Sequence, residues 1–408
     1  MPIDFPELSF DLALNPHATP DAPYGPRQLG VLDEARLDAA HRSISSWPGY
    51  APTPLVALPG LAKAVGIGML HYKQEAERFG LRSFKPLGGA YAVERCLTRV
   101  LTEQSGRTDI DTRSLLDGEH AQAVSDVTVT AATDGNHGRS VAWGARMFGC
   151  RCVIYINESV SRAREAAIAA YGAEVRRHPG SYDDAVREAF AVARREGWHV
   201  IPDTTDGEVV QAPRDVTQGY ALMAAEALEQ LADERAPTHL FLQAGVGGMA
   251  AAVCAEFWRA FGPKRPLTVI VEPKQAACWH ASLTAGAPTA VTGDIDSFMG
   301  GLACGEVSAL AWEILEPGAH ATLALDDAAA AATMRILAAG VHGDPCLVGG
   351  ESGVAGLAAL LTVAQDPEAR ETLGLSPDAR VLVFGSEGAT DEAMYEQVVG
   401  RPWHEVAS

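Results

Sequence analysis

The sequence predicts an α/β protein in which parallel-type sheets are flanked by helices and the chain is divided into two domains. From Val127 onward, short apolar runs of strand length alternate with segments of helical period. Such alternation with short links is typical of right-handed crossovers onto a parallel sheet. At 408 residues and 47% hydrophobic content, the chain can bury a large core and is long enough for two domains. A parallel sheet binds its ligand at the carboxyl ends of its strands, so the loops after each strand are where we look for a site.

The first part of the chain is expected to form an arm and the entry to the body. Residues 1–50 are rich in Pro, Asp and Ala, and we expect them to pack on the body or on a partner. Proline makes residues 51–55 rigid and extended. The elements expected up to residue 125 are helices over 32–45, 59–68 and 90–101 and a strand over 69–73.

The alternating region is expected to contain two sets of elements. In the first set, strands lie over 127–131, 152–156, 174–177 and 199–202, and helices over 139–148, 161–171 and 182–196. In the second, helices lie over 216–231, 249–261, 326–339 and 353–363, strands over 239–243, 267–272 and 380–384, and an irregular region over 273–317. Because no Pro/Gly-rich linker separates the sets, we expect an inserted lobe. The predicted domains are an arm (1–50), a large domain (51–125 and 205–408) and a smaller inserted α/β domain (126–204).

The composition excludes several classes of partner. A formal net charge of -20 with scattered positive residues argues against nucleic acid and against an anionic membrane surface. Seven cysteines, an odd number, predict no disulfide framework and indicate a reducing compartment, although a bridge between Cys278 and Cys304 stays open. Residues 1–16 are acidic without an apolar core, and no apolar run is long enough to cross a bilayer. We therefore expect a cytoplasmic protein without a membrane partner.

The candidate nucleophile is Lys85, in the run Ser83-Phe84-Lys85-Pro86-Leu87-Gly88-Gly89-Ala90-Tyr91. If Pro86 occupies the first turn of a helix, free N–H groups and the helix dipole disfavour an ammonium group at Lys85 and lower the lysine pKa. A lysine so placed can act as a nucleophile. An arbitrary Lys-Pro is more often a solvated lysine at a helix start, and the functional interpretation depends on motifs further along the chain.

A candidate phosphate site is the run Gly245-Val246-Gly247-Gly248-Met249 between a predicted strand and a predicted helix. Its backbone N–H groups can face an anion at the positive end of the helix. The same loop fits a dinucleotide site, because Gly245, Gly247 and Ala250 match G-x-G-x-x-A and Glu272 ends the next strand. Pro273 and the position deep in the chain argue against that site. From the loop alone, a lone phosphate group and a dinucleotide stay open, ahead of a purely structural turn.

Three further loops follow predicted strands. Residues 132–138 combine two glycines with Asp134, Asn136 and His137; Asp134 is either a general base or, as we favour from the loop alone, a helix cap. His137 is expected to be a buried core histidine rather than a metal ligand. Asp203 ends another strand of the same set and should lie at the same sheet edge, unless it is a solvated loop acid. Ser386 follows the last strand and either meets a ligand or only forms a turn.

In this order, the lysine segment, the Asp-Gly-Asn-His-Gly loop, the glycine turn and the closing Ser-Glu-Gly resemble the fold-type II pyridoxal-phosphate enzymes, the tryptophan synthase β-like family. Within that family the chain resembles the diaminopropionate ammonia-lyases from about residue 53 to residue 391. The motifs that carry this closer resemblance are Arg78-Phe79-Gly80-Leu81, 132–139, Pro202-Asp203-Thr204, 301–306, 350–353 and 386–388.

The resemblance implies a two-domain fold and a single phosphate group rather than a dinucleotide. It implies that Lys85 holds pyridoxal 5'-phosphate as a Schiff base next to Phe84, and that residues 245–249 bind the phosphate. It also implies that Asn136 bonds the phenolic oxygen and that Ser386 faces the pyridine nitrogen. A neutral hydroxyl leaves that nitrogen largely unprotonated, which favours elimination over transamination.

The implied reaction is the elimination of 2,3-diaminopropionate, a small amino acid, to pyruvate and ammonia. Asp134 and Asp203 are implied as bases on opposite faces of Cα, so that both D- and L-isomers react, with Lys85 returning a proton or acting as a base itself. A carboxylate at 134, where dehydratase-like members commonly have serine, favours the ammonia-lyase. Fold-level analogy suggests a homodimer.

Two departures and three alternatives remain at this point. The chain has Gln74 where the family usually has aspartate, and Ser386 where we expect threonine. A hydroxyamino-acid dehydratase acting on serine, threonine or 3-hydroxyaspartate would use the same fold and cofactor. A non-catalytic amino-acid-binding homologue would be expected to have lost Lys85, which is present. A dehydrogenase is the third alternative, and binding of NAD would support it.

Overall fold

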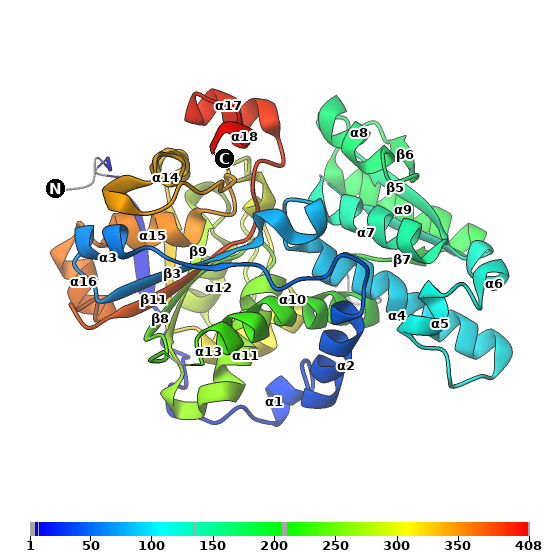
Figure 1. The fold of residues 1–408 in the computed structure, drawn as a ribbon, viewed down its shortest axis with the longest axis horizontal. Coiled ribbons are helices and arrows are strands. Elements are labelled where there is room, and N and C mark those ends of the chain that lie inside the picture. The colour runs from blue at the N-terminus through cyan, green and yellow to red at the C-terminus, as the bar shows by residue number, and fades with distance from the viewer. Residues whose placement is uncertain (1–4, 7, 134, 206–209, 233, 407–408) are drawn as a thin grey trace. The chain divides into compact units, whose positions relative to one another are not determined.

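The computed structural model describes residues 5–6, 8–133, 135–205, 210–232 and 234–406 (Figure 1). The chain forms two compact units. The large unit comprises Met1–Asp33, Pro52–Ser83 and Met223–Ser408, and the small unit comprises Glu34–Ala51 and Phe84–Leu222. Among the described residues, no helix combines the length and the hydrophobicity that crossing a membrane requires.

The large unit is built on a seven-stranded sheet in the order β1-β10-β9-β8-β11-β3-β2. Its strands are β1 (Phe10–Leu14), β2 (Leu55–Ala57), β3 (Met69–Gln74), β8 (His239–Gln243), β9 (Leu267–Pro273), β10 (Ala321–Leu325) and β11 (Arg380–Gly385). The five central strands are parallel, and only the edge strands β1 and β2 run antiparallel to their neighbours. The sheet is therefore mixed, and part of the expected arm, β1, pairs with β10.

The helices of the large unit cover both faces of its sheet. They are α1 (Pro26–Leu29), α3 (Pro59–Ala64), α11 (Gly248–Phe261), α12 (Cys278–Ala285), α13 (Ala309–Gly318), α14 (Asp327–Ala339), α15 (Ala355–Val363), α16 (Pro367–Leu373), α17 (Glu392–Val399) and α18 (Trp403–Val406). Short 3-10 helices are η1 (Glu75–Gly80), η2 (Gly262–Lys264), η3 (Lys274–Ala276), η4 (Gly300–Leu302) and η5 (Val341–Gly343). Figure 1 shows α14 and α15 on one side of the central strands and α11 and α13 on the other.

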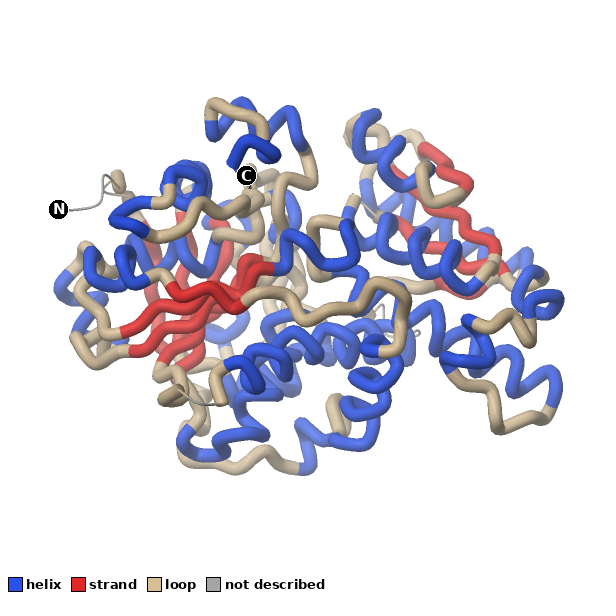
Figure 2. The backbone as a smooth tube through the Cα atoms, in the orientation of Figure 1, coloured by secondary structure: helices blue, strands red, loops and turns tan. Residues whose placement is uncertain are grey.

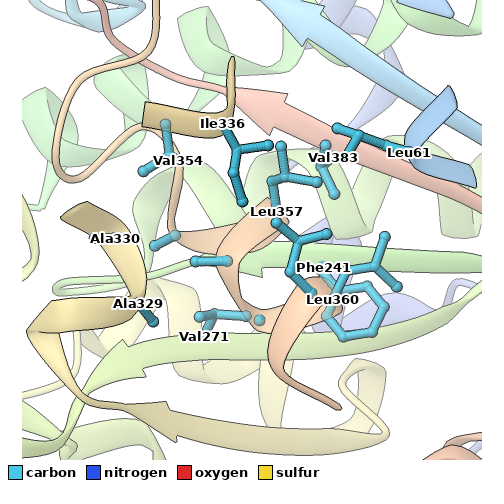
Figure 3. Close-up of a cluster of buried hydrophobic side chains, with 14 of the residues drawn as sticks. Leu61, Phe241, Val271, Ala329, Ala330, Ile336, Val354, Leu357, Leu360 and Val383 are labelled. Carbon is cyan, nitrogen blue, oxygen red and sulfur yellow. The ribbon is translucent and has the colours of Figure 1, made fainter. Parts of the chain in front are cut away.

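The core of the large unit forms where α15 packs on the central strands. In Figure 3, Leu357 and Leu360 of α15 lie against Phe241 of β8 and near Val383 of β11. All four side chains are buried to 1% exposure or less. Burial of each such side chain contributes about 1.5–3 kcal/mol. Because helices cover both faces, the interiors of β8, β9 and β11 are continuous apolar runs, whereas β3 carries the buried polar residues His71, Lys73 and Gln74.

The small unit contains a four-stranded, fully parallel sheet in the order β6-β5-β4-β7 (Figure 2). Its strands are β4 (Thr128–Ala132), β5 (Arg151–Ile156), β6 (Glu174–Arg177) and β7 (His199–Val200). Its helices are α2 (Glu34–Ser45), α4 (Lys85–Ser105), α5 (Thr112–Leu116), α6 (Ala121–Ser125), α7 (Asn136–Phe148), α8 (Arg162–Ala169) and α9 (Tyr182–Glu196), and α10 (Gln211–Gln230) continues into the large unit. The strand order reverses between β4 and β7, and such a reversal is where parallel α/β sheets bind ligands.

The contacts of α4, the helix that begins at Lys85, show that it packs in the small unit. A Cβ added at Gly89 would lie 1.9 Å from Ser140 Oγ of α7, and one added at Gly144 of α7 would lie 2.7 Å from the Cα of Ala90. Only glycine permits two helices to pack so closely. The small unit therefore includes α4 and α2, whereas the predicted inserted domain covers only 126–204; those domain boundaries stay a prediction.

Most elements of the alternating region lie where the sequence predicts them, and β6 and α9 match to the residue. The sequence did not predict the strands β1 and β10, nor the helices α1, α5, α6, α12, α13, α16, α17 and α18. Strand β10 has the sequence Ala-Thr-Leu-Ala-Leu, in which Thr322 is the sole β-branched residue. It is a strand because it pairs with β9 on one side and β1 on the other. Tertiary pairing thus overrides a weak local preference.

Candidate active site

Lys85 is the first residue of α4, and Pro86 lies in the first turn of that helix, as the sequence predicts. Lys85 Nζ donates a hydrogen bond to Asp203 Oδ2 at 2.9 Å. The two side chains are 22% and 24% exposed, so the pair is accessible to a ligand. The rings of Phe84 and Tyr220 lie 5.5 and 5.7 Å from the lysine nitrogen. The small unit thus brings an amine, a carboxylate and two aromatic rings together.

Asp203 follows β7 and is held as a carboxylate. Burial raises its pKa, but the charge of the Lys85 ammonium and its hydrogen bond lower it by more, so the pKa of Asp203 is below its ordinary value. His137 Nε2 must donate to the Ile201 carbonyl oxygen at 2.7 Å, because that oxygen can only accept. Burial lowers the pKa of His137, so its Nδ1, 3.9 Å from Asp203 Oδ2, carries no proton. His137 is a buried histidine, as expected, and it also faces Asp203.

The loop after β4 begins α7 with a threonine cap. Thr133 Oγ1 accepts hydrogen bonds from the amides of Gly135 and Gly138, both at 3.1 Å. Asn136 is the first residue of α7, and its Oδ1 accepts a hydrogen bond from Arg139 at 3.3 Å. The predicted base Asp134 lies outside the described residues. Thr133 therefore satisfies two amides at the start of α7. The helix cap or base expected of Asp134 stays a prediction.

Tyr220 of α10 is a residue that the sequence analysis did not find. Its ring centroid lies 4.6 Å from that of Phe84, and a Cβ added at Gly88 would lie 2.4 Å from the tyrosine ring. Burial raises the pKa of Tyr220 to about 12, so the hydroxyl is neutral. That hydroxyl is buried and faces the Lys85 amine. The sequence feature that could have indicated a neighbouring ring is the glycine pair Gly88-Gly89 in the first turns of α4, of which Gly88 makes room for the ring.

In the large unit, the glycine turn joins β8 to α11. Gly247 has φ +100° and caps α11, a left-handed conformation that suits glycine. Within the described chain, the amides of 245–249 donate no hydrogen bond. These donors lie at a helix N-terminus, where an anion is bound favourably. The turn therefore fits a phosphate group.

Ser386 lies at the end of β11, the strand beside β8. Gln243, the last residue of β8, donates through Nε2 to Ser386 Oγ at 2.8 Å and to the Phe384 carbonyl oxygen at 2.7 Å. The serine hydroxyl accepts this bond and keeps its own proton to donate. The sequence predicts Gln243 only as the last residue of a strand. The feature that could have indicated a role for it is a polar side chain at the carboxyl end of an otherwise apolar, buried strand.

Glu272 does not face a ligand, which removes the sequence support for a dinucleotide. Its side chain is fully buried and accepts hydrogen bonds from the amides of Trp279 (2.8 Å) and His280 (2.9 Å) in the first turn of α12. Burial raises the pKa of Glu272 to about 8, despite these bonds. A ribose-binding acid would instead present its carboxylate outside the strand ends.

The motif Arg78-Phe79-Gly80-Leu81 belongs to a buried ion network in the large unit. Arg78 binds both carboxylate oxygens of Glu226, at 2.8 and 2.7 Å, and both of Glu75, each at 2.8 Å. Lys73 adds a bond to Glu226 at 2.7 Å. Two cations thus balance two anions, and all four residues are at most 3% exposed. The network fixes η1, the turn that precedes the lysine segment in sequence.

Cys278 and Cys304, between which the sequence allowed a disulfide, both lie against Gly245. Cys278 Sγ is 3.9 Å from the Gly245 carbonyl oxygen, and a Cβ added at Gly245 would lie 2.8 Å from Cys304 Sγ. Neither cysteine forms a disulfide in the structure. Burial raises the pKa of Cys278, so it is a neutral thiol.

Comparison with known proteins agrees with this donor set. Residues 46–386 match the model of the pyridoxal-phosphate dependent enzyme family. The diaminopropionate ammonia-lyase of Escherichia coli K12 is 40% identical over 383 residues, which cover 92% of this chain and 94% of that protein.

Solved structures of the Escherichia coli enzyme are similar throughout. The holo form has a TM-score of 0.87 and 36% identity, and covers 97% of this chain and 98% of its own. The form in complex with an aminoacrylate-PLP azomethine reaction intermediate has a TM-score of 0.84, with the same identity and coverage. The chain belongs to the pyridoxal-phosphate dependent enzymes and, within them, to the diaminopropionate ammonia-lyase family.

Proposed function

We propose that this protein is a pyridoxal-phosphate dependent ammonia-lyase that converts 2,3-diaminopropionate, as both D- and L-isomers, to pyruvate and ammonia. The observation that carries the proposal is the Lys85–Asp203 pair at the start of α4, at 2.9 Å, in a chain 40% identical to a diaminopropionate ammonia-lyase. A nucleophilic amine beside a positioned carboxylate is what elimination requires. When bound, pyridoxal phosphate supplies an electrophilic carbonyl and a conjugated ring that stabilises negative charge at Cα.

The residues proposed to hold the cofactor are those that the sequence motifs indicate. In the small unit, Lys85 provides the amine, Phe84 lies beside it and Asn136 binds the phenolic oxygen. In the large unit, the amides of 245–249 bind the phosphate group, and Ser386 donates its proton toward the pyridine nitrogen. The Gln243 bond to Ser386 Oγ supports this role, because it orients the hydroxyl and leaves its proton free.

Asp203 removes a Cα proton from one face of the substrate. When the Lys85 amine is engaged, its charge no longer faces Asp203, and burial then raises the pKa of the carboxylate and makes it a stronger base. His137, which is neutral, adds no charge beside Asp203. Asp134 serves the other face of Cα, and Lys85 returns a proton or acts as a base.

The proposal is tested by measuring pyruvate release from D- and L-diaminopropionate and serine, and 2-oxo acid release from threonine and 3-hydroxyaspartate. We expect release from diaminopropionate, and none from any isomer in Lys85→Ala. Fast release from serine or 3-hydroxyaspartate but not from diaminopropionate would show a hydroxyamino-acid dehydratase instead. Binding of amino acids without any product would show a non-catalytic homologue.

The cofactor link is tested separately by borohydride reduction followed by peptide mapping. We expect the label on Lys85 and none on the exposed Lys63. A label on another lysine would contradict the assignment of Lys85, whatever the substrate.

We also propose a homodimer that acts in the cytoplasm. None of the seven cysteines forms a disulfide, which is consistent with a reducing compartment. Sedimentation of the purified holoenzyme tests the dimer, and a single species of about 43 kDa, the mass of one chain, would contradict it.

A further inference from the structure

The first turn of α12 supports the glycine turn through one side chain. Trp279 is fully buried, and its Nε1 donates to the Gly245 carbonyl oxygen at 3.0 Å. A Cβ added at Gly247 would lie 2.3 Å from Cζ2 of the same indole. The indole thus holds a carbonyl at one end of the turn and packs against the Cα of the left-handed residue in its middle.

Trp279 is itself fixed from two sides. Glu272 accepts the Trp279 amide at 2.8 Å and the His280 amide at 2.9 Å, and it contacts Cys278 Sγ at 3.5 Å. On the other side, the rings of Trp279 and Trp312 stack with centroids 6.0 Å apart and planes 23° from parallel. The carboxylate sets where α12 begins, and the start of α12 sets the indole.

We propose that Trp279 and Glu272 are positioning residues that hold the glycine turn in its phosphate-binding conformation before the cofactor arrives. This inference rests on the proposed function, because it assigns the turn to the phosphate group of pyridoxal 5'-phosphate. Neither residue contacts the phosphate; they act through Gly245 and Gly247.

The physical reason is the conformational freedom of the turn. A run with three glycines in four residues loses much entropy when it is ordered. If the cofactor had to order it, that cost would be subtracted from the binding free energy. Because the indole orders the turn during folding, the amides of 245–249 are already oriented when the anion binds.

The chain offers a matched control for Trp279. Trp258 of α11 is buried to 1% exposure, and its Nε1 donates to the Ala22 carbonyl oxygen at 2.9 Å. Trp279→Phe and Trp258→Phe therefore each remove one indole N–H bond to a backbone carbonyl in the large unit. Only the first of these bonds holds the glycine turn.

The experiment measures how fast pyridoxal phosphate leaves each holoenzyme on dilution into inorganic phosphate. We expect Trp279→Phe to lose cofactor about tenfold faster than the wild type, and Trp258→Phe less than twofold faster, with both melting at lower temperatures. Equal rates for Trp279→Phe and the wild type would overturn the inference. If the wild type takes up no cofactor at all, the proposed function fails instead.

A second pair of variants tests Glu272 in the same assay. Asp344 is a buried acid that likewise accepts two amides of a helix first turn, Gly60 at 2.7 Å and Leu61 at 2.8 Å, away from the glycine turn. We expect Glu272→Ala to speed cofactor loss, Glu272→Gln to restore retention because it keeps an acceptor oxygen, and Asp344→Ala to change stability alone. Faster loss in Asp344→Ala to the same extent would show a general effect of destabilisation and would overturn the inference.

Discussion

At the scale of single residues, the chemistry depends on how the fold changes ordinary side chains. Asp203 is an acid whose pKa depends on whether the Lys85 charge faces it, since burial alone raises that pKa. His137 stays neutral because burial lowers its pKa, and its one ring proton, on Nε2, is donated to the Ile201 carbonyl oxygen. The same residue types on an exposed surface would have none of these properties.

Asp203→Asn removes the carboxylate that faces Lys85 and keeps the side-chain volume. If Asp203 is the base on one face of Cα, we expect kcat to fall about 100-fold or more for one isomer of diaminopropionate and much less for the other. Pyruvate release from each isomer measures this. The control is Glu165→Gln, whose carboxylate pairs with Arg177 at 2.6 Å with both side chains 23% exposed; equal losses for both isomers in Asp203→Asn would contradict the one-face role.

Gly247→Ala tests the close approach at the glycine turn. Both the left-handed backbone and the contact with Trp279 oppose a methyl group there, so we expect loss of cofactor binding. Gly400→Ala is the control, because Gly400 has φ +83° and nothing within 4 Å of an added Cβ. It should lower stability by about 1 kcal/mol and leave cofactor binding unchanged. Titration with pyridoxal phosphate distinguishes the two.

At the scale of elements, the start of α4 and the turn before it are fixed by different means. Gly88 and Gly89 let Tyr220 and Ser140 reach the first turns of α4. In the large unit, the network around Arg78 holds η1, where Phe79 has φ +51° without being glycine. A strained turn persists only where its surroundings fix it.

Glu226→Gln breaks the buried network and leaves Lys73 and Arg78 with too little negative charge. An unbalanced buried charge destabilises by about 3–5 kcal/mol, so we expect a large drop in the free energy of unfolding. The partly exposed pair Arg82–Glu392 is the control, since Glu392→Gln should cost at most about 1 kcal/mol. Denaturant unfolding of the two variants measures both values, and similar costs would contradict a stabilising role for the network.

The pH dependence of stability should carry a contribution from Glu272. Its folded pKa, about 8, is above the ordinary value, so the stability it contributes is complete below about pH 4.5 and is lost as the pH rises toward 8. The groups next to it are the Cys278 thiol and the amides of Trp279 and His280. As the pH rises within that window, the free energy of unfolding should fall less steeply in Glu272→Gln, by as much as about 1.4 kcal/mol per pH unit. Unfolding by denaturant from pH 5 to pH 8 tests this, and parallel curves would contradict it.

At the scale of the whole molecule, each of the two units, taken by itself, presents polar groups after the ends of parallel strands. In the small unit, Asn136 and Asp203 follow β4 and β7, between which the strand order reverses, and Lys85 begins α4. In the large unit, the glycine turn and Ser386 follow the neighbouring strands β8 and β11. The carboxyl ends of parallel strands are where such a topology directs ligands.

Pyridoxal phosphate should therefore stabilise the whole protein. A ligand that binds only the folded state adds about 2.7 kcal/mol at 100 times its dissociation constant, so we expect the melting temperature to rise by several degrees. Lys85→Ala should keep a smaller part of that rise, because the phosphate group still binds the glycine turn. Scanning calorimetry with and without cofactor measures both shifts, and a rise with NAD instead would favour a dinucleotide site.

The sequence by itself determined the fold class, the cofactor and the order of the motifs. Strand and helix periods are local properties, and the segments around Lys85, residues 134–138 and residues 245–249 are contiguous, so both can be recognised without a structure. Family membership then follows from their order.

Only the tertiary structure decided which side chains support those motifs. Tyr220, Gln243 and Trp279 lie in segments far in sequence from the groups that they contact, and nothing local distinguishes them. Glu272 shows the same limit, since its position at a strand end suited a ribose ligand until its hydrogen bonds to α12 were seen. Burial and long-range contacts set the pKa of Asp203 and of Glu272, and neither can be obtained from local sequence.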